Sequence, residues 1–165
     1  MSVISSVKDP AALTMTITAE FAAPQEHVWR LWADPRLLER WWGPPTYPAT
    51  VVDHDLTPGG RVNYYMTGPE GDQPRGWWRI LSVDPPAGLS FEDGFADSQG
   101  NPDPAMPTMV IRVSVEPREP GVTRMVIATT FPSLETMEQL VAMGMEEGMM
   151  AAMGQIDAIL AERPA

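Results

Sequence analysis

The chain has 165 residues, a formal net charge of -11 and a pI near 4.4, so it is long enough for one domain with a sizeable core and is strongly acidic. Acidic surfaces repel phosphate backbones and anionic lipids, and we therefore expect neither nucleic acid nor a membrane as a partner. The chain has no cysteine, which excludes disulfides and thiolate chemistry, and with only two histidines we expect no metal site and no cofactor.

Residues 1–11 lack the apolar run of a signal peptide, and we expect them to be a flexible segment of a cytoplasmic protein. Residues 12–163 are expected to form a single domain, because no linker or repeat divides them. Its first element, Leu13 to Phe21, alternates apolar residues with threonines and predicts a half-buried strand.

Two short helices should follow this strand. Pro24 is placed to open the first helix, and Asp34 and Pro35 form the cap and first turn of the second. Helices of about two turns are not stable alone, so they must pack against something. The paired Trp41 and Trp42, just before Gly43, are the side chains best suited to hold them.

The middle of the chain predicts six strands separated by turns rich in proline and glycine, the pattern of an antiparallel meander. The predicted strands are Ala49 to Leu56, Arg61 to Thr67, Trp77 to Val83, Leu89 to Gly94, Thr108 to Glu116 and Val122 to Phe131. A helix from Ser133 to about Glu162 ends the chain and should lie across the apolar face of the sheet. The fold class is therefore α+β in the order β-α-α-β6-α, with a curved antiparallel sheet wrapped around a long C-terminal helix.

Two glycines interrupt the inward face of the terminal helix. Gly144 and Gly148 are one turn apart, and a glycine inside a helix costs about 1 kcal/mol relative to alanine. The missing side chains either leave a cavity beneath the helix or allow close packing against large aromatic residues. Both interpretations remain open at this stage.

The other flanks of this helix are rich in methionine. Met143, Met150 and Met153 are expected on the solvent side, with Met145 and Met149 extending a second flank. A helix that is apolar almost all round is normally covered on both sides, and methionine suits adaptable contacts. We therefore predict a homodimer formed through this helix.

These features together resemble the activator-of-heat-shock-protein-90-ATPase homologue family, within the SRPBCC (START/Bet v 1-like) superfamily. The matching pieces are Phe-Ala-Ala-Pro at 21–24, Val-Trp at 28–29, Asp-Pro at 34–35, Trp-Trp-Gly at 41–43, Asp-Leu-Thr-Pro-Gly-Gly-Arg at 55–61, Gly-Pro at 68–69 and the run from Gly76 to Phe91. With the terminal helix they cover roughly residues 12–162. The resemblance implies a helix-grip fold with a pocket between sheet and helix, but it does not imply chaperone activation. The family often has Gly-Trp late in the terminal helix where this chain has Gly148-Met149, which should alter one wall of the pocket.

The candidate site residues come from the aromatic strands, the tryptophan pair and the glycine gap. Adjacent strand residues face opposite ways, so one of Tyr64 and Tyr65 and one of Trp77 and Trp78 can line the pocket. The expected pocket residues are Trp41, Trp42, Tyr65, Trp77, Arg79, Phe91, Gly144, Glu147, Gly148 and Ala151.

Few residues suggest chemistry. No nucleophile elbow, phosphate loop or metalloprotease motif is present. Arg79 and Glu92 either enter the cavity, where burial would raise a carboxyl pKa, or pair on the outer face of the sheet; Asp93, Arg112 and Glu147 are further acid or base candidates.

The sequence predicts a protein that binds a small hydrophobic ligand, such as a lipid, a polyketide or an aromatic molecule. The first alternative is an enzyme of the polyketide cyclase/dehydratase or hydrolase type. The second is a protein-interaction or chaperone-associated module. Whether the protein is an enzyme stays open, and no catalytic residue is assigned.

Overall fold

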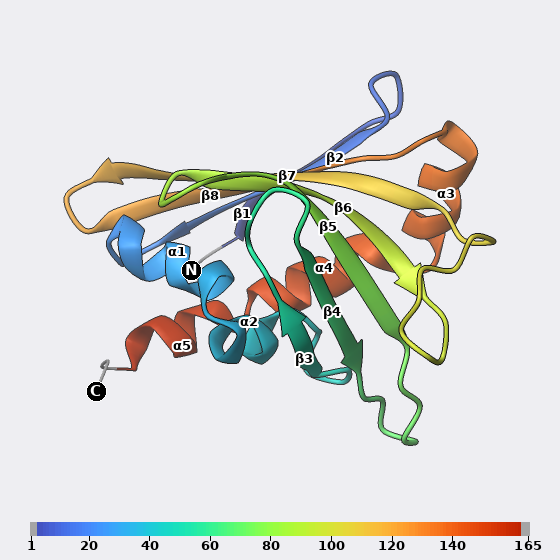
Figure 1. Cartoon of the computed structure of the whole chain (residues 1–165). Coiled ribbons are helices and arrows are strands. Elements are labelled where there is room, and N and C mark those ends of the chain that lie inside the picture. The colour runs from blue at the N-terminus through green and yellow to red at the C-terminus, as the bar shows by residue number, and fades with distance from the viewer. Residues whose placement is uncertain (1–2, 163–165) are drawn as a thin grey trace.

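The computed structural model describes residues 3–162. Its central feature is an eight-stranded antiparallel sheet with the strand order β1-β2-β8-β7-β6-β5-β4-β3. The sheet curves, and the helices lie on its concave side (Figure 1). The strands are β1 Val3–Asp9, β2 Thr14–Phe21, β3 Ala49–His54, β4 Arg61–Met66, β5 Arg75–Asp84, β6 Gly88–Ala96, β7 Thr108–Glu119 and β8 Val122–Thr130. The helices are α1 Gln25–Ala33, α2 Pro35–Trp41, α3 Leu134–Ala142, α4 Met145–Met153 and α5 Ile156–Ala161. This is the predicted α+β helix-grip class.

The first strand is a correction to the sequence prediction. Residues 3–9 lie in the segment expected to be flexible, yet they form β1 and pair antiparallel with β2 from Asp9 opposite Thr14. The segment has no alternation of apolar and polar residues, which is why the pattern did not reveal a strand. The strand is formed through its backbone hydrogen bonds with β2, and its side-chain pattern does not indicate it.

The alternation predicted for β2 is present. Its burial alternates along the strand, with Met15, Ile17, Ala19 and Phe21 inside. The opposite residues, which include three threonines, are half-buried on the other face. Strands β7 and β8 alternate in the same way, so the concave face of the sheet is one side of the core.

The two short helices begin where the prolines predict. The Asp34 side chain accepts a hydrogen bond from the Arg36 backbone N–H at 2.9 Å, and Pro35 is the first residue of α2. Trp32 of α1 and Trp41 of α2 are fully buried with their ring centroids 4.8 Å apart in an edge-to-face contact. The tryptophans thus hold the helix pair against the sheet.

The terminal helix is not continuous, contrary to the prediction. Ser133 caps its start, but the chain breaks into α3, α4 and α5 at Gly144 and again at Gly154. Gly144 has a φ of 94°, a left-handed conformation that glycine adopts easily and other residues avoid. The break lets the chain change direction between α3, near one end of the sheet, and α4, which crosses the concave side (Figure 1).

The methionines of this region do not share one solvent-facing side. Met153 is fully buried, which corrects its predicted place on the exposed face. Met145 and Met149 are half-buried and pack against the core, whereas Met143 and Met150 stay exposed. The homodimer through this helix stays a prediction.

Candidate ligand-binding site

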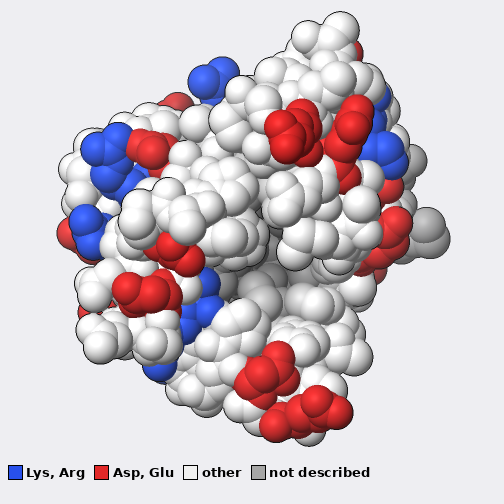
Figure 2. All heavy atoms as spheres, turned by 90° about the vertical axis from the view of Figure 1, so that its right-hand side faces the viewer, with Lys and Arg blue, Asp and Glu red and all other residues white. Residues whose placement is uncertain are grey.

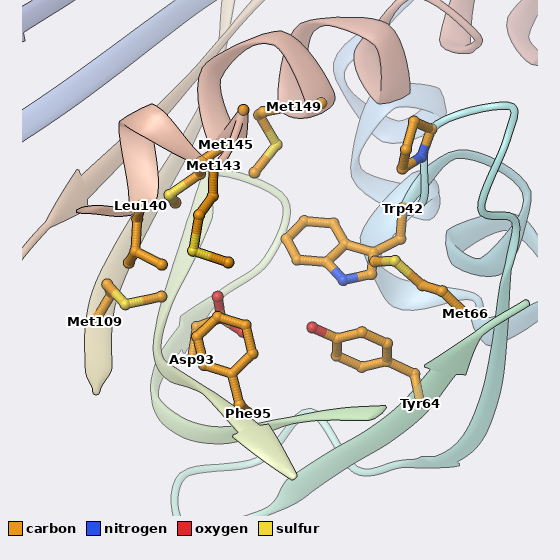
Figure 3. Close-up of a pocket in the computed structure, with 13 residues that line it drawn as sticks. Trp42, Tyr64, Met66, Asp93, Phe95, Met109, Leu140, Met143, Met145 and Met149 are labelled. Carbon is orange, nitrogen blue, oxygen red and sulfur yellow. The ribbon is translucent and has the colours of Figure 1, made fainter. Parts of the chain in front are cut away.

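A cavity of about 270 Å³ lies between the sheet and the break of the terminal helix. Its lining comes from the end of α2 and the loop after it, from β4, β6 and β7, and from α3 and α4 (Figure 3). The lining residues are Trp42, Pro44, Tyr64, Met66, Asp93, Phe95, Met109, Leu140, Met143, Gly144, Met145, Gly148 and Met149. Asp93 is the only charged residue in this set.

The glycines of the helix break contribute open space. A Cβ atom added at Gly144 or Gly148 would meet no heavy atom within 4 Å beyond its own chain neighbours. Both residues line the cavity, as expected from their missing side chains. Met143, with 67% of its surface exposed, stands at the mouth of the cavity.

A cluster of aromatic rings packs on the sheet side of the cavity. Trp42 lines the cavity and meets Trp78 edge-to-face with the ring centroids 4.8 Å apart. Beneath them, Trp78 stacks on Phe91 at 4.0 Å. Such close contacts make this wall rigid, so the cavity has a preformed shape.

Strand register brings Asp93 into this apolar surrounding. Arg79 on β5 lies opposite Glu92 on β6, and the two form an ion pair on the outer face. Successive residues of a strand point to opposite faces, so the next pair, Trp78 and Asp93, points inward. The register between β5 and β6 therefore explains both the outer Arg79–Glu92 ion pair and the inward position of the Asp93 carboxyl.

Asp93 as a whole residue is half-buried, but its Oδ1 atom is shielded from water, and this shielding determines the electrostatic state of the carboxyl. Loss of water contact raises the pKa of the Asp93 carboxyl to about 7, and the nearby Tyr64 hydroxyl and Trp78 indole lower this pKa only in part. Burial, helped by the negative charge of Asp93, also raises the pKa of Tyr64. Asp93 is thus partly protonated near neutral pH, whereas Tyr64 keeps its proton.

Polar atoms of this cluster lack hydrogen-bond partners among the described residues. Asp93 Oδ1, Trp42 Nε1 and Trp78 Nε1 are all buried and unpaired. A buried polar group without a partner costs about 1–3 kcal/mol. Figure 3 shows the Tyr64 hydroxyl turned toward the same space, so an unsatisfied acceptor and several donors converge there. A bound molecule with a polar group could complete these hydrogen bonds.

The structure brings some of the predicted pocket residues together and not others. Trp42, Gly144 and Gly148 line the cavity. Trp41 and Phe91 are fully buried behind it, and Glu147 and Ala151 are exposed on α4. Arg79 is on the outer face with Glu92.

Tyr65 and Trp77 also lie on the outer face, because their neighbours Tyr64 and Trp78 point inward. The guanidinium of Arg75 lies 5.0 Å from the centroid of the Tyr65 ring. Trp77 donates from Nε1 to the Phe95 carbonyl oxygen at 3.1 Å and covers Gly94, where a Cβ would meet the indole. The mirror arrangement occurs inside, where Tyr64 covers Gly76. One outward ring, Trp77, and one inward ring, Tyr64, are thus each matched to a glycine on the neighbouring strand.

The cavity residues that sequence reasoning did not assign come mainly from strand ends and loops. The sequence indicates Asp93 only as one acid among several, and it gives no indication that Met66, Phe95 and Met109 line the cavity. Strand alternation could have identified Asp93. If Arg79 and Glu92 pair on the outer face, the residue after Glu92 must point to the inner face. No comparable signal marks the methionines, whose place depends on the curvature of the sheet.

Figure 2 shows the end of the molecule at which α3 and the open ends of β4 and β6 lie. The surface is hollowed at its centre, and uncharged side chains form most of the rim. Acidic side chains lie beyond the rim on several sides, while basic ones lie mainly on the left. The approach to this end is therefore largely uncharged, with an acidic periphery.

Within residues 3–162, no group of three histidine, aspartate or glutamate side chains is arranged to hold a metal ion. In the same range, no helix has both the length and the apolar character needed to cross a bilayer. The half-buried His54 does not face the cavity; its Nε2 lies 2.9 Å from the Trp32 carbonyl oxygen.

Comparison with known proteins identifies the family of the chain. The profile of the family described as "Activator of Hsp90 ATPase homolog 1-like protein" matches residues 22–161. A solution structure from Arthrobacter aurescens is 50% identical, with a TM-score of 0.92 over 98% of this chain and 93% of that one. A crystal structure from Mycobacterium smegmatis is 47% identical, with a TM-score of 0.88 over 99% of both chains.

A more distant solution structure, from Staphylococcus epidermidis, is 28% identical with a TM-score of 0.83 over 98% of each chain. The search among curated proteins found no match. The family profile spans most of the chain, including the helix pair, strands β3 to β8 and the broken terminal helix. The chain therefore belongs to the activator of Hsp90 ATPase homologue 1-like family.

Proposed function

We propose that the protein binds a small, mostly apolar molecule, such as a lipid, polyketide or aromatic metabolite, in the cavity between the sheet and α4. One observation carries the proposal: a preformed cavity of about 270 Å³ is lined by methionine and aromatic side chains and contains a single carboxyl. Ligand sites are typically concave and mostly apolar, with a few converging polar groups. The modest volume favours a compact ligand rather than a long acyl chain.

The open space at Gly148 supports this function. A cavity that served only as a packing defect would be costly, since an empty cavity destabilises by about 24 cal/mol per Å³. Gly148 has ordinary helix geometry within α4, so alanine would fit there and strengthen the helix. A bound molecule that needs this space would explain why the position is glycine and not alanine.

Filling the cavity should test the proposal. N-phenyl-1-naphthylamine, a fluorescent apolar probe, should bind the protein and brighten on transfer from water. In Gly148→Leu the new side chain would occupy the cavity, and the affinity for the probe should fall at least tenfold.

The matched control is Ala151→Leu, which places the same side chain at an exposed position of the same helix outside the cavity. Its probe affinity should stay unchanged. Absence of probe binding to the unmodified protein, or equal losses in both variants, would exclude the cavity as the binding site.

A second candidate function, acid–base catalysis on the bound molecule, is favoured by Asp93. A carboxyl with a pKa of about 7 can both give and take a proton near neutral pH. Tyr64 is the only other titratable side chain among the residues that line the cavity, and its raised pKa makes it a donor rather than a base. Binding therefore remains the primary proposal, because the cavity offers one carboxyl that titrates near neutral pH and no second side chain that could act as a base beside it.

A further inference from the structure

We propose that the cavity selects an apolar molecule that carries a protonated amine, with the ammonium group held against Asp93 and the aromatic walls. The inference rests on the proposed binding function and specifies the chemical class of the ligand. It is carried by the geometry of the cavity, whose only charged residue is an acid with an unpaired buried oxygen.

The first argument is the unpaired carboxylate oxygen. Asp93 Oδ1 is buried and has no hydrogen-bond partner of normal geometry within the described part of the chain, although the Tyr64 hydroxyl and the Trp78 indole lie close enough to the carboxyl to lower its pKa. A hydroxyl or amide N–H of a ligand would supply the missing hydrogen bond but not the missing charge. An ammonium group supplies both, and ion pairs gain strength where water is excluded.

The second argument is the lining around the carboxyl. The rings of Trp42, Tyr64 and Phe95 and the sulfur atoms of the methionines face the same space (Figure 3). Aromatic faces attract organic cations by about 0.5–2 kcal/mol each, depending on how far they are desolvated. Polarisable thioethers accept such ligands without the rigid fit that branched side chains impose.

The third argument is charge. The lining contains neither lysine nor arginine, and the whole chain has a formal net charge of -11. A fatty acid or another anionic ligand would place its charge beside Asp93 with no cation to offset it, so anions are disfavoured. A cation is attracted by the acidic molecule as a whole and then by the single acid inside.

The charged groups of the neighbouring elements do not compete for the amine. On β4, Tyr64 is the titratable side chain that faces Asp93, and on β5 the facing side chain is Trp78. On α4, Glu146 is engaged by Ser6 and Lys8, and Glu147 is exposed. The folded protein has already removed water from Asp93 Oδ1, so the main further loss of hydration on binding is that of the amine itself.

Protonation of Asp93 and binding of the amine are linked. The folded protein holds the pKa of the Asp93 carboxyl at about 7, and an ammonium group beside it would lower this pKa. Affinity for an amine should consequently rise as the pH increases through this range. Affinity for a neutral molecule of the same shape should not rise, because the protonated acid suits it at least as well.

Three isosteric probes test the inference by competition with N-phenyl-1-naphthylamine at about pH 5.5 and pH 8. The probes are 2-naphthylmethylamine, 2-naphthalenemethanol and 2-naphthoate. At pH 8 the amine should bind about ten times more tightly than the alcohol, and the naphthoate most weakly. The amine-to-alcohol ratio should shrink at pH 5.5.

Two variants test whether Asp93 causes the preference for the amine over the alcohol. In Asp93→Asn the amine and the alcohol should bind alike, with the alcohol close to its affinity for the unmodified protein. In Glu147→Gln, which removes an exposed acid from α4, the preference for the amine should persist.

The outcomes separate the two proposals. If the alcohol binds at least as tightly as the amine at pH 8, or Asp93→Asn keeps the preference, the amine inference is overturned while the apolar site stands. If none of the three probes displaces N-phenyl-1-naphthylamine, or that probe itself does not bind, the proposed binding function fails with it.

Discussion

At the scale of single residues, Asp93 is the most unusual group of this protein. Its carboxyl is placed in an apolar cavity by strand register, without a cationic partner in the lining. Such a placement destabilises the ionised form, and burial raises the pKa to about 7 from the ordinary value of 3.8. The folded protein therefore holds a proton there over a range in which the unfolded chain releases it.

This difference predicts a pH-dependent effect of Asp93→Asn. Between about pH 4 and 7 the folded state binds more protons than the unfolded state, so the contribution of Asp93 to stability falls as the pH rises. Asparagine carries no charge, and the variant should be more stable than the original protein by roughly 1–3 kcal/mol at about pH 8. The gain should shrink toward pH 4. Urea unfolding at several pH values measures it.

The control for this experiment is Asp84→Asn, at the exposed end of β5. It should not show a stability difference that grows between pH 4 and 7. A gain for Asp93→Asn that is the same at every pH, or larger in acid, would mean that Asp93 stays ionised in the folded protein.

At the scale of elements, the break in the terminal helix shapes the side of the cavity that α3 and α4 form. Gly144 and Gly148 look alike in the sequence, but they have different backbone roles. Gly144 has a φ of 94° and ends the path of α3, whereas Gly148 lies inside α4. Both leave open space, so steric crowding does not distinguish them.

The two glycines should consequently respond to alanine with opposite signs. Gly144→Ala forces a left-handed conformation on a residue with a Cβ and should destabilise by about 1–2 kcal/mol. Gly148→Ala improves helix propensity and should stabilise by about 0.5–1 kcal/mol. Urea denaturation of the two variants provides the comparison. Changes of the same sign would show that α3 and α4 are not separated as the φ of Gly144 requires.

At the scale of the whole molecule, the first strand, β1, contacts the helix α4 near the other end of the sequence. Glu146 in its first turn accepts hydrogen bonds from the Ser6 hydroxyl and, at 2.7 Å, from Lys8 Nζ, both on β1. Lys8, the only lysine in the chain, thus helps to hold the helix that covers the cavity. The hydrogen bond from Lys8 is the main cause that lowers the pKa of Glu146.

Glu146→Gln should loosen α4. A carboxyl with a lowered pKa stabilises the fold above its unfolded pKa, and this contribution is lost as the pH falls through the folded value. At neutral pH the variant should show faster amide hydrogen exchange in α4 and β1, while α2 stays unchanged. Glu138→Gln, at an exposed position of α3, is the control. Unchanged exchange in α4 would show that the contact contributes nothing measurable, as many exposed ion pairs do.

The sequence by itself determined the elements that depend on local chemistry. Prolines and a capping aspartate marked α1 and α2, period-two alternation marked β2, and recurring proline and glycine turns marked the strands from β3 to β8, because these signals act over a few residues. The order of these elements, together with the family resemblance, was enough for the α+β helix-grip class. The same local signals missed β1 and the break at Gly144, since neither the pairing of an edge strand nor a positive φ follows from residue pattern alone.

Only the tertiary structure decided which side chains meet in the cavity. Alternation states that Tyr64 and Tyr65, or Trp77 and Trp78, point to opposite faces, but it does not say which of them points inward. Which ring points inward is determined by the register between the strands and by which face of the sheet the helices cover. Asp93 faces the cavity for the same reason, because the Arg79–Glu92 pair lies outside. Its shifted pKa arises from neighbours on distant parts of the chain, which share no local pattern with it.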